Sequence, residues 1–192
     1  MLNKIKYFFR KKIRDHGKNN YVPYRPKGTR IIIDGDNNKI LIDPSISVFN
    51  CKIKLGDSHT RTNSCTVRIG KGCTSNSMEI ILYEHNSQVN IGEDCMFACR
   101  IQFFNTDCHA ILDKTSGKVI NVGKEINIGN HVWVGMDTLI LKNTTIPSNC
   151  VVGAHSLVNK KFTEENTVIA GHPARVVKRG ITWDRKKAND FR

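Results

Sequence analysis

The hydrophobic positions in the last third of the chain follow a six-residue period. Aliphatic residues stand at Ile128, Val134, Ile140, Ile146, Val152 and Val158. A small or β-branched residue follows the first five of them after four positions, at Val132, Thr138, Thr144, Cys150 and Ser156. Neither the helical period nor the alternation of a simple strand gives this spacing. A hexapeptide period is typical of a parallel β-solenoid, so the pattern predicts a triangular prism with one short strand and one corner per hexapeptide.

The same pattern appears earlier in the chain, where it is interrupted twice. The step from Ile69 to Ile91 is 22 residues, and the step from Phe103 to Ile128 is 25. Neither is a multiple of six, so each requires an insertion. The second insertion contains a cluster of turn-forming residues, and we expect a loop over about 110–125 that projects from the prism.

Both ends of the chain depart from the hexapeptide pattern. Apolar residues at helical spacing among lysines and arginines predict a basic amphipathic helix over 1–20. Its apolar face either packs on the protein or on another subunit, or residues 1–18 lie on an anionic membrane surface. The prism is expected over 21–162. Residues 163–192 are expected to form a turn, a short helix after Pro173 and a basic tail.

The net positive charge of the chain is confined to its two ends. The chain of 192 residues has 30 Lys and Arg against 17 Asp and Glu, a net charge of +13. Residues 1–30 hold ten basic residues and one acidic residue, and residues 176–192 hold six basic and two acidic residues. Residues 31–175 hold equal numbers of basic and acidic residues. A neutral body argues against a nucleic-acid partner and favours basic surfaces at the two ends that meet something acidic.

Cysteine use and apolar runs bear on compartment. The seven cysteines form no CxxC pair and no repeated Cys/His spacing, so we expect no metal site. Free thiols favour a reducing compartment. No apolar run approaches the roughly 20 residues of a membrane span, and the basic residues near the N-terminus interrupt any signal-peptide core. The expected location is cytoplasmic, with peripheral attachment to the inner face of the membrane as an option.

Three segments resemble a known family: residues 128–135, 152–156 and 170–175, which read IGNHVWVG, VGAHS and AGHPAR. They are similar to the hexapeptide-repeat acyltransferases, with the pattern of the galactoside, maltose, xenobiotic and surface-polysaccharide O-acetyltransferases. The resemblance covers roughly 31–183. It implies an all-β fold, a left-handed parallel β-helix, and acetyl transfer from acetyl-CoA to a hydroxyl of a carbohydrate acceptor. It also implies homotrimers with sites between neighbouring prisms and no metal.

His109 matches the catalytic histidine of this family and precedes the expected loop. A sugar hydroxyl is a weak nucleophile, and a base with a pKa near neutrality accelerates its attack roughly 10²–10⁴-fold. Asp107 lies two residues earlier. If both stand on one strand they share a face, so Asp107 either orients the imidazole, binds the acceptor or caps the loop. Cys108 then faces the other way and is a poor nucleophilic partner.

Alignment with the family implies further contacts. Asn105 and Trp133 are expected at the acceptor, and Trp133 either packs on the pantetheine arm or fills the core. The expected coenzyme A contacts are Trp133, Met136, Ala154, Asn159, Lys160, Arg175 and Lys178. The last two suit phosphates. Asn159 departs from the threonine that is frequent there. His131, His155 and His172 occupy variable repeat positions and are expected to be exposed.

Two other functions stay open. An N-acetyltransferase that acts on an amino sugar or a sugar nucleotide has the same fold. A non-catalytic solenoid scaffold is the alternative outside enzymology, and the presence of His109 with the coenzyme A motifs argues against it. A zinc-dependent carbonic anhydrase on this fold is disfavoured, because its usual pair of histidines five residues apart is missing.

Overall fold

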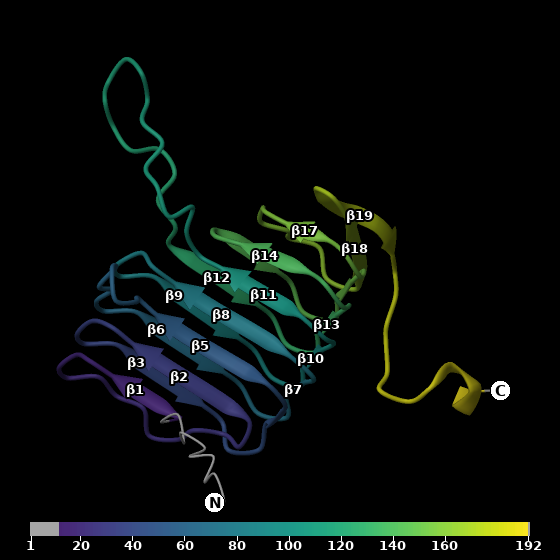
Figure 1. Cartoon of the computed structure of the whole chain (residues 1–192). Coiled ribbons are helices and arrows are strands. Elements are labelled where there is room, and N and C mark those ends of the chain that lie inside the picture. Colours follow the sequence, from purple (N-terminus) through teal and green to yellow (C-terminus); the bar gives the residue numbers. More distant parts are fainter. Residues whose placement is uncertain (1–11, 192) are drawn as a thin grey trace, which may run out of the picture.

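The computed structural model describes residues 12–191, which form a three-sided prism (Figure 1). Sheet A contains β1 (Ile13–Asp15), β2 (Thr29–Ile33), β5 (Cys51–Leu55), β8 (Met78–Leu82), β11 (Ile101–Phe104), β14 (Leu139–Leu141) and β17 (Leu157–Val158). Sheet B contains β3 (Lys39–Ile42), β6 (Thr66–Ile69), β9 (Gln88–Ile91), β12 (Glu125–Ile128) and β15 (Thr144–Ile146). Sheet C contains β4 (Ser47–Val48), β7 (Thr74–Ser75), β10 (Met96–Phe97), β13 (Trp133–Val134), β16 (Val151–Val152), β18 (Thr167–Gly171) and β19 (Ala174–Arg179).

From β2 to β17 the chain visits sheets A, B and C in turn, and the strands of successive coils pair in parallel. On sheet A, for example, Ile53 pairs with Ile80, Ile80 with Phe103, and Phe103 with Ile140. All four side chains are fully buried. The aliphatic member of each hexapeptide therefore points into the prism, where identical registers stack apolar side chains on one another. The predicted triangular solenoid is confirmed.

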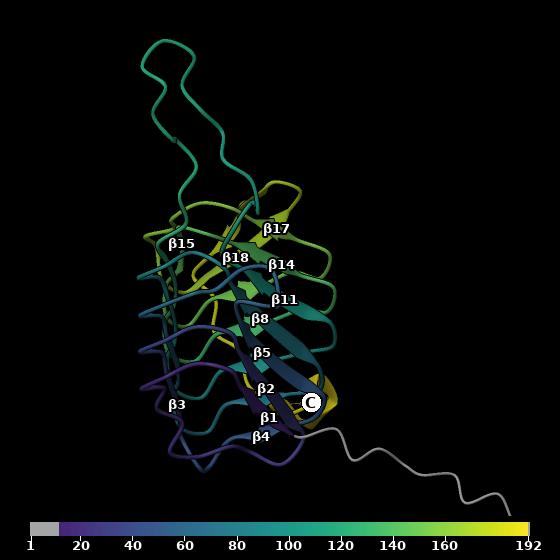
Figure 2. The same ribbon diagram turned by 60° about the vertical axis from the view of Figure 1, so that its left-hand side comes forward.

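All the large insertions lie at one corner, between sheets A and B. In the regular coil, Ile146 on sheet B stands six positions after Ile140 on sheet A. The equivalent steps are 11 positions from Ile31, 16 from Ile53, 11 from Ile80 and 25 from Phe103. The last step contains residues 105–124, most of which project from the prism as a long loop (Figures 1 and 2). Both off-register steps of the sequence thus reflect insertions at the same corner.

The predicted N-terminal helix is wrong where the structure describes it, because Ile13–Asp15 form strand β1. Ile13 pairs with Ile31, and Tyr21 bridges in parallel to Lys39. The prism therefore begins at residue 13, not 21. The edge of β2 offers backbone partners, and this pairing overrides a local helical spacing. Residues 1–11, which hold the rest of that prediction, lie outside the described residues.

The predicted helix after Pro173 is also wrong. Residues 174–179 form β19, which pairs antiparallel with β18, so that Ile169 lies opposite Val176. β-Branched residues such as Val176 and Val177 favour strands, and the free edge of β18 gives them backbone partners. β19 closes the sheet at the end of the prism.

The last segment, residues 180–191, turns back along the prism, and we call it the strap (Figure 1). It ends in the short 3₁₀-helix η1 (Ala188–Phe191), the only helix within residues 12–191. In that part of the chain no helix is long and apolar enough to cross a membrane.

Candidate active site

The insertions between sheets A and B enclose a cavity of about 580 Å³. The insertions of three successive coils contribute to its walls, and the projecting loop forms one side. The lining residues are Asp57, His59, Thr60, Tyr83, Glu84, Thr106, Cys108, His109, Ala110, Val119, Asn121 and Val122. The predicted catalytic histidine therefore lies in a cavity that the coil insertions build.

His109 is exposed in this cavity, and its imidazole makes no hydrogen bond to any residue between 12 and 191. Its backbone is held, since the carbonyl oxygen accepts a hydrogen bond of 2.9 Å from Asn121 Nδ2. Asn121 belongs to the returning arm of the loop. The arrangement fixes the backbone at His109 while both ring nitrogens stay open to a bound molecule.

Asp107 does not contact the His109 ring, so the expected orienting contact is missing from this chain. Strand β11 ends at Phe104, and Cys108 adopts a left-handed φ of 63°. Residues 107 and 109 therefore do not share a strand face, which removes the premise of the prediction. Asp107 Oδ2 instead pairs with Lys142 and accepts a hydrogen bond of 2.8 Å from Asn121 Nδ2. These hydrogen bonds, Lys142 first, lower the pKa of Asp107, which remains a carboxylate that ties the loop to the prism.

Asn105 differs from the prediction because it is fully buried and lines no part of the cavity. It continues the inward alternation of Ile101 and Phe103 beyond the end of β11. Neither its Oδ1 nor its Nδ2 has a hydrogen-bond partner within the described chain. An inward position at a prism corner accounts for its burial, and direct contact with an acceptor is not seen.

One wall of the cavity contains residues that sequence reasoning missed. The ammonium group of Lys54 hydrogen-bonds to the Tyr83 hydroxyl and lies 3.1 Å from Asp57 Oδ2. Burial raises the pKa of Tyr83. The backbone N–H of His59 is the strongest of several hydrogen-bond donors that lower the pKa of Asp57. Tyr83 therefore presents a neutral phenol to the cavity. No local spacing reveals this cluster, because Lys54 and Tyr83 lie 29 positions apart on stacked coils.

Glu84 adds an acidic group to the same cavity. Its Oε1 accepts a hydrogen bond of 2.7 Å from Thr106 Oγ1. The Thr106 hydroxyl oxygen in turn accepts a hydrogen bond of 2.9 Å from the Cys108 backbone N–H. Among residues 12–191 Glu84 forms no ion pair. The wall opposite the loop is thus polar, with a phenol and an unpaired carboxylate near His109.

The residues predicted to bind coenzyme A do not meet at one place on this chain. Met136 and Ala154 lie at the corner between sheets C and A, whereas Asn159 and Lys160 follow β17 toward sheet B. Trp133 lies on sheet C and is 38% exposed. None of them lines the His109 cavity.

Arg175 and Lys178, the predicted phosphate ligands, lie on the exposed strand β19. Neither forms an ion pair within the part of the chain that the structure describes. Arg179, the next cation on this strand, differs because it pairs with Glu164, at 2.6 Å from Arg179 Nε to Glu164 Oε2. Two exposed cations without an ion-pair partner in the described chain suit phosphate groups, and their contact with coenzyme A stays a prediction.

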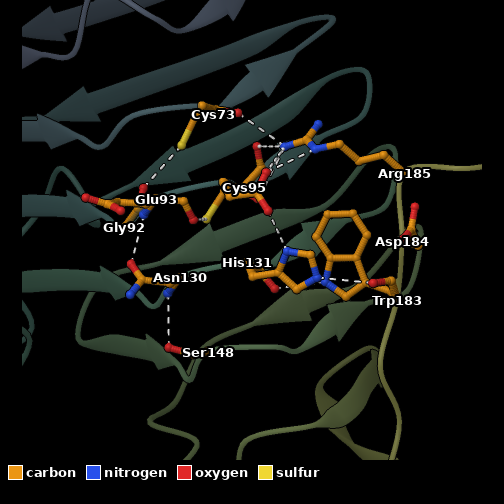
Figure 3. Close-up of polar contacts among 12 residues, drawn as sticks. Cys73, Gly92, Glu93, Cys95, Asn130, His131, Ser148, Trp183, Asp184 and Arg185 are labelled. Carbon is orange, nitrogen blue, oxygen red and sulfur yellow. Dashed lines mark hydrogen bonds and ion pairs between the residues drawn. The ribbon is translucent and has the colours of Figure 1, made fainter.

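A second cavity, of about 790 Å³, lies where the strap crosses sheet C. The Trp183 ring stacks on His131 with centroids 4.1 Å apart, and its Nε1 donates to the His131 carbonyl oxygen at 2.8 Å (Figure 3). His131 Nδ1 lies 2.7 Å from Asp94 Oδ2, and Nε2 lies 3.1 Å from the Trp183 carbonyl oxygen. His131, which we expected to be exposed, therefore anchors the strap. Trp133 lines this cavity, 6.1 Å from Trp183 between ring centroids.

The seven cysteines are all free thiols, and five of them are buried. Cys73, Cys95 and Cys150 occupy small inward positions of the repeat with fully or almost fully buried side chains. Over residues 12–191 no three His, Cys, Asp or Glu side chains gather in a way that holds a metal ion.

Comparison with known proteins agrees with the geometry, although no family model matches the chain. The polysialic acid O-acetyltransferase OatWY has a crystal structure that superposes with a TM-score of 0.79 and 31% identity, over 91% of this chain and 92% of that one. This chain belongs to the hexapeptide-repeat acetyltransferases. The polysialic-acid-specific acetyltransferase NeuO superposes with a TM-score of 0.74 and 26% identity, over 92% and 89% of the two chains.

Two curated proteins are also similar to this acetyltransferase. An uncharacterized 24.8 kDa protein from the cps region of Klebsiella pneumoniae is 36% identical over 170 residues, which are 82% of this chain and 72% of that protein. A polysialic acid O-acetyltransferase of Neisseria meningitidis is 36% identical over 111 residues, about half of each protein. The solenoid is accordingly a left-handed parallel β-helix, as the resemblance implied, and the protein is an acyltransferase.

Proposed function

We propose that this acetyltransferase moves an acetyl group from acetyl-CoA to a hydroxyl of an acidic surface polysaccharide, with His109 as general base. The observation that carries the proposal is the open His109 ring in a cavity of about 580 Å³, which accommodates a sugar unit. The similarity to polysialic acid O-acetyltransferases supports a glycan acceptor.

The chemistry is a direct transfer. His109 accepts the proton of the acceptor hydroxyl as its oxygen attacks the thioester carbonyl carbon. The tetrahedral intermediate collapses, the carbon–sulfur bond breaks, and the imidazolium returns the proton to the sulfur. The products are an acetyl ester and coenzyme A. Tyr83 and Glu84 on the opposite wall hydrogen-bond to the neighbouring hydroxyls of the sugar and so orient the one that reacts.

We propose that the active enzyme is a homotrimer. The projecting loop carries five exposed aliphatic residues, Ile111, Leu112, Val119, Ile120 and Val122, each about half exposed or more. An apolar patch of this kind at the end of a long loop marks a contact surface. A neighbouring prism that covers it brings Trp133 and the coenzyme A residues of one subunit toward the His109 cavity of the next. This arrangement unites two half-sites that one chain keeps apart.

The decisive experiment compares the wild-type enzyme with His109→Ala and with His155→Ala, a matched control at an exposed histidine. Acetyl-CoA consumption is measured with polysialic acid, neutral polysaccharides, sugar nucleotides and amino sugars as acceptors. We expect transfer to an acidic polysaccharide, with rates that fall by about 10²–10⁴ in His109→Ala alone. Equal rates in His109→Ala and wild type contradict the assignment of the base.

The acidic groups that line the cavity, Asp57 and Glu84, give the amino-sugar alternative one point of support, because carboxylates also suit an ammonium group. Product chemistry separates the two. An O-acetyl ester is cleaved by mild base or hydroxylamine, whereas an N-acetyl amide survives. A product from an amino-sugar acceptor that survives mild base and hydroxylamine replaces our proposal with N-acetylation. Absence of acetyl transfer to every acceptor favours the non-catalytic scaffold.

A further inference from the structure

The cavity between the strap and sheet C is separate from the His109 cavity, and the mechanism above leaves most of it unused. Sheet C contributes Met96 and Trp133, and the strap contributes Trp183, Lys186, Lys187 and Phe191. Trp133 is 38% exposed and Phe191 is 65% exposed. The groove, as we call it, therefore offers aromatic surface and two lysines along one side of the prism.

The strap that forms this groove is fixed in place by many contacts. Arg185 spans two coils: its guanidinium reaches Asp94 Oδ1 at 2.8 Å and Thr74 Oγ1 at 2.8 Å. It also donates to the backbone carbonyl oxygens of Gly72 and Cys95. Because Arg185 and the stacked Trp183 are both engaged with the prism, the strap is a built wall of the groove.

The charge of the groove is positive. The Arg185 cation is neutralised by Asp94. Lys186 and Lys187 pair with no carboxylate anywhere between residues 12 and 191, and the Lys186 ammonium group lies 5.9 Å from the Phe191 ring centroid. The one acidic residue of the lining, Asp184, accepts a hydrogen bond from the Lys186 backbone N–H. Two ammonium groups without an ion-pair partner in the described chain, one of them next to the Phe191 ring, remain for a ligand.

We propose that this groove binds the acidic chain of the polysaccharide acceptor at units beyond the one that reacts. Aromatic rings pack on the apolar faces of sugar rings, and lysines pair with carboxylates along the chain. Coenzyme A fits less well, because Trp133 is the only predicted coenzyme A residue that lines the groove. The inference rests on the proposed function, since it requires a polymeric anionic acceptor.

This placement predicts that affinity depends on acceptor length. A short oligosaccharide reaches only the His109 cavity, whereas a longer chain also occupies the groove. Two linked contacts raise the apparent affinity without a change in the chemical step. The groove variants below should therefore change KM for long acceptors and leave kcat unchanged.

The test uses the full-length double variant Lys186→Gln/Lys187→Gln and a matched control, Lys27→Gln/Lys39→Gln, which removes the same charge at exposed lysines of the first coil. Binding of polysialic acid, of a sialic acid dimer and of dextran is measured by calorimetry at several salt concentrations. Because binding requires no turnover, His109→Ala protein serves as a second background. We expect polysialic acid affinity to fall about tenfold in the groove variant alone, with a weaker salt dependence.

Kinetics complete the test. The groove variant should raise KM for long polysialic acid about tenfold while KM for acetyl-CoA and kcat for the dimer stay at wild-type values. Phe191→Ala should weaken long-chain binding and leave its salt dependence unchanged. Equal losses in the groove and control variants, or no loss in either, overturn the groove. Wild-type protein that binds no acidic polysaccharide overturns it as well, and transfer to neutral glycans in that case still leaves the O-acetyltransferase activity in place. A higher KM for acetyl-CoA assigns the groove to the donor and also overturns the proposal.

Discussion

His109 and His131 occupy two corners of the same prism and have opposite surroundings. His131 lies in a regular corner between sheets B and C, with Asp94 and Trp183 on its two ring nitrogens and an indole stacked on its face. His109 lies in an insertion between sheets A and B, and its ring makes no hydrogen bond within residues 12–191. A ring whose nitrogens are both bonded cannot exchange a proton with a substrate unless it gives up a contact. The comparison shows that local surroundings, and not residue type, separate the catalytic candidate from the structural histidine.

The largest expected effect comes from the paired substitutions His109→Ala and His131→Ala. The first should lower kcat by about 10²–10⁴ and leave the free energy of unfolding within about 0.5 kcal/mol. The second should lower stability by about 1–2 kcal/mol and keep the chemical step. Steady-state kinetics and thermal unfolding of both variants check the contrast. If His131→Ala removes activity without loss of stability, the roles of the two corners are not as described.

Trp183→Ala should release the strap, because it removes both the stacking on His131 and the hydrogen bond to its carbonyl oxygen. Loss of a buried tryptophan costs about 3 kcal/mol, and here it lowers the free energy needed to open the strap. Hydrogen exchange of the backbone amides in residues 180–187 measures this free energy. Trp183→Phe is the control, since it keeps a stacked ring and should exchange at an intermediate rate. Unchanged exchange in Trp183→Ala would falsify the anchoring role.

Acidification should loosen the same anchor. Partial burial raises the pKa of Asp94, but the hydrogen bonds from His131 and Arg185 outweigh it, so its pKa lies below the ordinary value of 3.8. A carboxylate with a lowered folded-state pKa stabilises the fold fully above its unfolded value, and this contribution is lost as the pH falls through the folded value. Protonation of Asp94 should therefore speed hydrogen exchange of the strap amides below about pH 4. In Asp94→Asn the strap should be looser at neutral pH, and this acid transition should be absent.

Tyr83→Phe tests the wall that faces His109. The substitution removes the hydroxyl that bonds to Lys54 and lines the cavity. One lost hydrogen bond to the acceptor should raise KM for the acceptor about 3- to 10-fold, while KM for acetyl-CoA stays constant. Thr60→Val, which lies in the same lining, is a matched control. Equal kinetics in Tyr83→Phe and wild type remove Tyr83 from the acceptor site.

Deletion of residues 2–11 should have the smallest effect on the folded protein. Strand β1 begins at Ile13, so the deletion must stop before it to leave the prism intact. The segment contains four Lys and Arg, each worth about 1 kcal/mol next to an anionic membrane. We expect weaker binding to vesicles that contain anionic lipid, with unchanged thermal stability and kcat. Vesicle binding that survives the deletion assigns membrane contact to another surface.

The prism could be predicted from the sequence because its period comes from burial. Each inward aliphatic, such as Ile140 or Ile146, repeats at the six-residue step that stacked coils impose. The ends could not be predicted in this way. Ile13 and Val176 joined sheet edges whose unpaired backbone groups are created only when the prism forms.

The candidate site was predictable only where the sequence resembles a known family. His109 was placed by its match to the catalytic histidine of that family, and the structure puts it in the cavity. The Lys54–Tyr83 contact and the His131–Trp183 stack join residues 29 and 52 positions apart. An insertion separates Lys54 from Tyr83, and Trp183 lies in a tail without repeat periodicity. Neither spacing therefore carries a recognisable signal.

The confinement of insertions to the corner between sheets A and B has a consequence for how such enzymes diversify. The other two corners depart from the six-residue step by at most one residue, while this corner accommodates 5 to 19 extra residues in four coils, as the steps from Ile31, Ile53, Ile80 and Phe103 show. One loop can therefore replace another at this corner without a change in the buried core. New acceptor preferences can arise by recombination at one edge, with the folding of the scaffold left untouched.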